Sequence, residues 1–130
     1  MIYVFDITTT KNTSSSNKKK TVLRMEQGII YKIEISFPPG SAGLLHLQIN
    51  DALHQVWPTN EGASFSGDNV EIDFENEYPL IAPPYELSAY TWNEDELWDH
   101  DVTIRLGIKS IPGATTMTTE LAEAMAGAPY

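Results

Sequence analysis

The 130-residue sequence contains no cysteine. This absence excludes disulfide bonds, thiol catalysis and cysteine-ligated zinc, and it leaves the redox compartment undetermined. No apolar run approaches the roughly 20 residues that a membrane-spanning helix needs, so we expect no membrane partner. Residues 1–6 lack the basic start and apolar stretch of a classical signal peptide, and we therefore expect synthesis in the cytoplasm without export.

Basic residues are scarce, with eight Lys and Arg against 18 Asp and Glu, for a net charge of −10. An acidic body repels the phosphate backbone, which disfavours nucleic-acid binding. The charge is also sorted along the chain. The segment through Lys32 holds six basic and two acidic residues, whereas the remainder holds two basic and sixteen acidic residues. This split predicts one part that contacts a negative surface and a body that stays soluble.

Period-two alternation of apolar and polar side chains dominates the sequence and indicates strands with one buried face. It is clearest in 31–37, 70–75 and 102–109; in the first of these, Tyr31 and Ile33 are predicted to share the buried face. Weaker strand signals occupy 2–8, 21–25, 44–49, 53–57 and 85–92. Glycine- and proline-rich joints separate these segments and stop strand pairing. About eight strands without intervening helices predict an all-β, single-domain β-sandwich with jelly-roll-like connections over residues 1–111.

Two appendages differ in composition from this body. Residues 8–20 are polar and basic and predict a long mobile loop after the first strand. Within it, Lys18, Lys19 and Lys20 are predicted to contact an acidic surface, for which a second copy of this chain is one candidate. The alternative is a solvated loop tip without a partner.

The second appendage is a C-terminal tail, 112–130, in which 118–126 has the residues of a short helix. Acidic residues near its start suit the helix dipole. Leu121 and Met125 are spaced four apart and would form an apolar stripe. Because a helix of about nine residues is marginal alone, we predict that Leu121 and Met125 contact a surface of the same domain or of a neighbour.

Metal-binding and catalytic patterns are weak. His46 and His54 could approach each other across a hairpin, but together with His100 they lack the spacing of a zinc site, so ordinary hydrogen-bonded histidines are favoured. The acidic stretch 93–101 could supply oxygen ligands to calcium, yet it lacks the order of a calcium-binding loop and is more typical of a solvated loop. Glu71, Asp73, Glu75 and Glu77 alternate as on a solvent-facing strand. We predict no metal, no cofactor, no catalytic residue and no enzyme activity.

Aromatic residues crowd the third quarter of the chain. In 85–92, Tyr90 and Trp92 share the more polar face, which predicts contact with a partner protein or a sugar. The alternative function is therefore a carbohydrate-binding module that uses Tyr90, Trp92 and Trp98, with calcium held by Asp95, Asp99 or Asp101. A hydrolase that uses two of the body's carboxylates is a third hypothesis.

Several stretches within about 38–108 carry a resemblance to a known group of proteins. The most distinctive is Tyr90-Thr91-Trp92-Asn93-Glu94-Asp95, supported by 43–49, 53–58 and 99–108. The chain resembles small uncharacterised structural proteins of tailed viruses. The resemblance implies a non-enzymatic virion protein that decorates or stabilises the capsid surface, made in the host cytoplasm. The implied partners are further copies, as a trimer or other cyclic oligomer, and the major capsid protein or another virion protein. It assigns no site residues.

Overall fold

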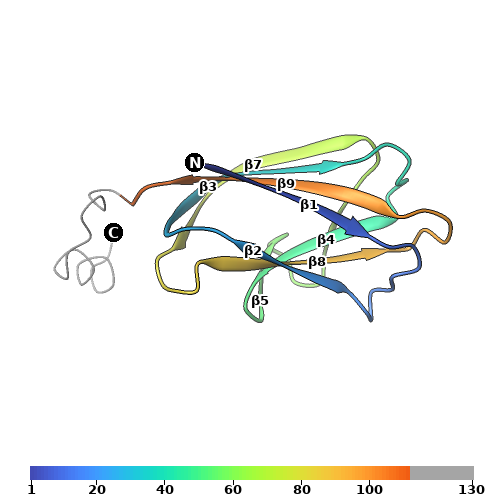
Figure 1. The fold of residues 1–130 in the computed structure, drawn as a ribbon, viewed down its shortest axis with the longest axis horizontal. Helices are drawn as coiled ribbons and strands as arrows, with labels where there is room; N and C mark the ends of the chain where they lie inside the picture. Colours follow the sequence, from blue (N-terminus) through green and yellow to red (C-terminus); the bar gives the residue numbers. More distant parts are fainter. Residues whose placement is uncertain (112–130) are drawn as a thin grey trace.

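The computed structural model describes residues 1–111, which form nine strands in two antiparallel sheets (Figure 1). In order across the sheet, the first, sheet A, contains β1 (Ile2–Thr9), β9 (His100–Lys109), β3 (Gly28–Phe37) and β7 (Val70–Leu80). The second, sheet B, contains β2 (Lys19–Arg24), β8 (Glu86–Asn93), β4 (Leu45–Asp51) and β5 (His54–Trp57), with the short β6 (Phe65–Ser66) beside β4. The all-β expectation is confirmed for the described residues.

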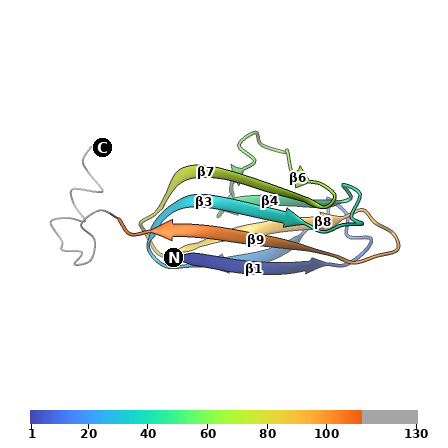
Figure 2. The same cartoon turned by 90° about the horizontal axis from the view of Figure 1, so that it is seen from above.

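The two sheets stack as layers (Figure 2). Their facing side chains are buried between these layers. Alternation along β9 sends Val102, Ile104 and Leu106 inward, where they are fully buried. Leu47 and Ile49 of β4 meet them from sheet B. Each such side chain contributes about 1.5–3 kcal/mol through burial, so this shared core holds the sandwich together.

A β-bulge in β3 changes the face that Tyr31 occupies. The pairing of β3 with β7 and β9 shifts register between Ile30 and Lys32. Ile30 is therefore fully buried, whereas the ring of Tyr31 lies over Gly107 on the outer face of sheet A, 3.0 Å from where a Cβ on that glycine would be. The prediction that Tyr31 shares the buried face with Ile33 was wrong, because strict alternation does not foresee an inserted residue.

The basic loop is shorter than the predicted 8–20. Thr8 and Thr9 extend β1, and Lys19 and Lys20 already belong to β2. The connecting residues 10–18 lie against the end of β8, where Thr13 forms an isolated bridge with Asn93. The mobility of this loop stays a prediction.

The tail 112–130 lies outside the described residues, and with it the predicted helix 118–126 and its Leu121 and Met125. Within residues 1–111 there is no helix that is long and apolar enough to span a membrane.

Candidate interaction site at one end of the sandwich

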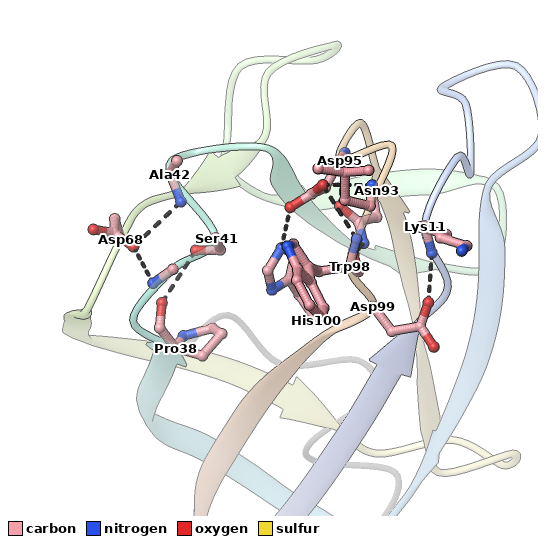
Figure 3. A network of polar contacts seen from close by, with 12 residues as sticks. Lys11, Pro38, Ser41, Ala42, Asp68, Asn93, Asp95, Trp98, Asp99 and His100 are labelled. Atoms are coloured by element: carbon pink, nitrogen blue, oxygen red, sulfur yellow. Dashed lines mark hydrogen bonds and ion pairs between the residues drawn. The ribbon is translucent and has the colours of Figure 1, made fainter.

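The end of the sandwich where β8 leads into β9 is filled by polar side chains (Figure 3). The hydroxyl of Thr9 donates a hydrogen bond to the hydroxyl of Thr91 at 2.8 Å, which links sheet A to sheet B. The hydroxyl of Ser41 bonds the carbonyls of Pro38 and Gly67. Buried polar groups are costly unless they are hydrogen-bonded. Here they are bonded, so this end is closed by specific contacts and not by apolar packing.

Asp95 fixes the backbone of the β8–β9 loop, residues 94–99. Its Oδ1 accepts hydrogen bonds from the N–H groups of Leu97 at 2.8 Å and Trp98 at 3.2 Å. Its Oδ2 lies 2.7 Å from Nε2 of the buried His100 at the start of β9. An aspartate that bonds the next backbone N–H groups is a local turn-forming device. The loop therefore has one defined backbone path.

Asn93 completes this support from the end of β8 and is fully buried. Its Oδ1 accepts a hydrogen bond from the N–H of Asp95 at 3.0 Å. Its Nδ2 donates to the carbonyls of Trp98 at 2.9 Å and Thr9 at 3.2 Å. A single side chain thus ties the loop to both sheets.

These contacts also lower the pKa of the Asp95 carboxyl below its usual value of 3.8. The largest cause is the hydrogen bond from the N–H of Leu97, followed by the hydrogen bond from His100, and both favour the charged form. The loop support is therefore strongest when Asp95 is ionised.

The loop presents two large apolar side chains to solvent, Leu97 at 71% exposure and Trp98 at 67%. Exposed apolar groups on a fixed backbone lose little conformational entropy when a partner covers them. Tryptophan is also enriched among the residues that dominate protein interfaces. We define Leu97 and Trp98 as the tip pair. The sequence signal for it was the pair Asn93 and Asp95 just ahead of Trp98, which predicts a fixed turn.

Trp92 lies in a different environment, on the outer face of sheet B, and is only 7% exposed. The ring of His46 stacks on it with 4.9 Å between ring centroids. The ammonium of Lys18 lies 4.8 Å from its centroid and also donates to Oε1 of Gln48. The predicted contact of Trp92 with a partner or sugar requires an exposed ring, which this arrangement does not provide. Sequence reasoning missed this cover because Lys18 comes from the loop before β2 and His46 comes from β4, both distant from Trp92 in the sequence.

The three lysines that were predicted to contact a partner differ in the groups that they contact within the protein. Lys18 covers Trp92, and Lys19 donates to the carbonyl of Thr8 at 2.6 Å. Lys20 is exposed and lies opposite the half-buried Tyr90 in the β2–β8 pairing. Of the three lysines, Lys20 makes no side-chain bond within residues 1–111, and its contact with a partner, like that of Tyr90, stays a prediction.

Two of the three histidines, His46 and His100, have ordinary hydrogen-bond partners. His46 Nδ1 lies 3.0 Å from the hydroxyl of Ser64, and its Nε2 lies 2.6 Å from the carboxylate of Glu94. His54 is exposed at the start of β5, where it pairs with Asp51 at the far end of β4, so His46 and His54 are not brought together. Within residues 1–111, no three His, Asp or Glu side chains are grouped as a metal site would require.

The outer face of sheet A carries the acidic residues of β7 as predicted, with Glu71, Asp73 and Glu75 all exposed. A depression of about 50 Å³ lies elsewhere on this face, lined by Ile2, Tyr31, Lys32, Glu34, Arg105 and Gly107. Small-molecule pockets typically measure roughly 300–1,000 Å³. This depression is therefore too small to hold a sugar ring or a comparable substrate.

A search of family models, of curated proteins and of solved structures found no match to this chain.

Proposed function

We propose that this protein is a non-enzymatic structural component that docks onto a larger protein particle. The candidate particle is the capsid of a tailed virus, as the resemblance of the sequence implies. Copies would associate as a cyclic homo-oligomer on the capsid surface and contact the major capsid protein or another virion protein. The acidic body keeps the free protein soluble until it docks.

The strand pairing supports a jelly-roll classification of the sandwich. With β6 set aside, β1 pairs with β9, β2 with β8, β3 with β7 and β4 with β5. This is the pattern of one long hairpin with arms β1–β4 and β5–β9. Rolling that hairpin brings β9 beside β3 and β8 beside β4, as observed. Double-sheet jelly rolls of this kind are common in viral capsid proteins and in lectins.

The tip pair is the observation that carries the proposal. Leu97 and Trp98 are exposed apolar side chains at the end of an acidic domain, and Asp95 and Asn93 hold their backbone in place. A single well-placed tryptophan can supply a large share of the affinity of a protein interface. Exposed Lys20 would add electrostatic steering toward an acidic neighbour.

The test is co-sedimentation with capsid shells assembled from the major capsid protein of the same genome. We expect the wild-type protein to bind saturably. Trp98→Ala should lose about 2 kcal/mol of binding free energy, roughly a thirtyfold weaker affinity. Leu53→Ala is the matched control, because Leu53 is an exposed apolar residue in the β4–β5 turn, away from the tip. Absence of saturable binding by the wild-type protein would contradict the proposal.

An exposed indole on a fixed loop also suits stacking against a sugar, and a glycan array separates the two functions. If Trp98-dependent binding appears on the array and not on capsid shells, the carbohydrate-binding alternative is favoured. In that case Trp98, and not the covered Trp92, is the stacking residue.

A further inference from the structure

Apart from the two-residue β6, the two sheets have four edge strands, and three of them are protected against pairing with another strand. β2 carries Lys19, Lys20 and Arg24, and β5 is only four residues long. β7 has acidic side chains along its length and Pro79 near its end, and the bulge in its neighbour β3 interrupts their pairing. Charges, proline, bulges and short length are the ways by which proteins prevent edge strands from associating.

The fourth edge, β1, is the least protected of the four over residues 2–6. It is eight residues long, contains no proline or lysine, and has Asp6 as its one charged residue. Ile2 is 66% exposed and Val4 is 56% exposed on the outer face of sheet A. A long edge that has exposed apolar side chains and only one charged residue is a template for strand addition.

This edge also has backbone N–H and C=O groups that are available to pair with another strand. Met1 exchanges both of its backbone hydrogen bonds with Ile108 of β9. In an antiparallel pair, alternate residues bond the neighbour, so the N–H and C=O groups of Ile2, Val4 and Asp6 point away from β9. Within residues 1–111 these groups have no hydrogen-bond partner across the free edge. The carbonyl of Thr8 is different, because the Lys19 ammonium caps it at 2.6 Å.

We propose that the β1 edge pairs with β1 of a second copy, antiparallel and centred on Val4. The two copies of sheet A, with four strands each, would then form one continuous eight-stranded sheet across a twofold axis. This contact is independent of the tip pair and of any capsid, so its failure would leave the docking proposal standing.

The positions of the outward-facing backbone groups in residues 2–6 favour a second copy of this chain as the partner strand. Ile2, Val4 and Asp6 are spaced symmetrically about Val4. Antiparallel self-pairing therefore places the outward N–H and C=O groups of one copy opposite those of the other. Val4 meets Val4 of the second copy, and Ile2 meets its Asp6. The two capped Thr8 carbonyls fall outside the paired segment. A twofold contact of this kind uses the same patch on both subunits.

The charge distribution permits this contact between two acidic bodies. The two Asp6 carboxylates would lie about 14 Å apart, at a rise of roughly 3.4 Å per residue. The acidic β7 strands would occupy the two outer edges, about 34 Å apart at ~4.8 Å per strand. Both separations exceed the Debye length of about 10 Å at 0.1 M salt. The contact therefore keeps the acidic strands as far apart as the sheet allows.

The remaining like charges near the contact give it a diagnostic salt dependence. β2 contacts β1 within one protomer, so its exposed Lys20 and Arg24 would approach the same residues of the second copy. Salt screens this repulsion. Self-association through β1 should strengthen as salt rises, whereas association through attraction between the basic and acidic segments should weaken.

Sedimentation velocity of the full chain at low and high salt tests the proposal. We expect a monomer–dimer equilibrium whose dimer fraction rises with salt. Val4→Lys should weaken dimerisation at least about tenfold, which is about 1.4 kcal/mol. The matched control is Val70→Lys on β7, also an exposed valine on an edge strand but at the far edge of sheet A, and it should dimerise as the wild type does. A monomer at every concentration, a trimer, or equal association of both lysine variants would overturn the proposal.

Cross-linking provides a second test, because the chain has no native cysteine. In the proposed register the two residues at position 4 have Cα atoms about 5.5 Å apart, within the range of a disulfide. Those at position 8 would be about 27 Å apart at 3.4 Å per residue. Val4→Cys should therefore form a disulfide-linked dimer under mild oxidation and Thr8→Cys should not. Failure of Val4→Cys to cross-link, or efficient cross-linking of Thr8→Cys, would refute the register.

Discussion

The middle of the sandwich and its β8–β9 end are both buried, yet they are built from different chemistry. In the middle, apolar side chains such as Leu106 and Leu47 fill the space between the sheets. At the end, Asn93, Asp95 and His100 fill it with hydrogen bonds. Apolar packing is non-directional and supplies stability, whereas hydrogen bonds are directional and specify position. The difference indicates that the middle stabilises the fold and the polar end positions the tip pair.

The largest expected effect comes from the middle. Leu106→Ala should lower the free energy of unfolding by about 2–5 kcal/mol, because it removes a fully buried side chain and leaves a cavity. Urea denaturation measures this change, with exposed Leu53→Ala as the control that stays within about 0.5 kcal/mol. A loss for Leu106→Ala no larger than that of the control would break the distinction between core and surface.

A smaller effect on stability, with a sharper local signature, is expected at the polar end. Asn93→Ala should cost about 1–3 kcal/mol, because it leaves the carbonyls of Thr9 and Trp98 without their donor. Amide hydrogen exchange at Leu97 and Trp98 should accelerate more than exchange in the core strands.

The matched control for this variant is Asn76→Ala, whose side chain is exposed on β7 and bonds only the next residue. It should leave exchange in the β8–β9 loop unchanged. If Asn93→Ala also left that loop protected, Asn93 would not be what positions the tip pair.

The smallest effect is the pH dependence of Asp95. Because its pKa in the folded protein lies below 3.8, its contribution to stability is complete above that value and is lost as pH falls through the folded pKa. Urea midpoints measured from pH 6 to pH 2.5 should show wild type more stable than Asp95→Asn at pH 6. The difference should shrink as the pH drops below about 4.

Glu96→Gln is the control for that titration, because Glu96 is an exposed carboxylate of the same loop. It should follow the wild-type profile over the whole range. A constant difference between wild type and Asp95→Asn at every pH would mean that ionised Asp95 does not support the loop.

Much of the fold was predictable because strand alternation is a local property. The segment 102–109 alternates without interruption, and β9 buries the predicted face. The bulge at Tyr31 and the two-residue β6 were not predictable, since both depend on partner strands that the local pattern does not reveal. The candidate site was predictable only in part. Trp98 was identified among the aromatic residues, but only as one member of a sugar-binding set.

Where a strand has no bulge, the sequence by itself determined which side chains face the core, because a period of two divides such a strand into two faces whatever its neighbours are. It also determined the acidic body and the basic segment that precedes it.

Tertiary structure decided which outward-facing groups stay accessible. Trp92 is covered because Lys18 reaches it from the loop before β2 and His46 reaches it from β4, whereas Trp98 remains exposed. The order of strands decided that β1, with its open Ile2–Asp6 backbone, lies at an edge of sheet A. Both outcomes depend on contacts between residues far apart in the chain, which no local pattern encodes.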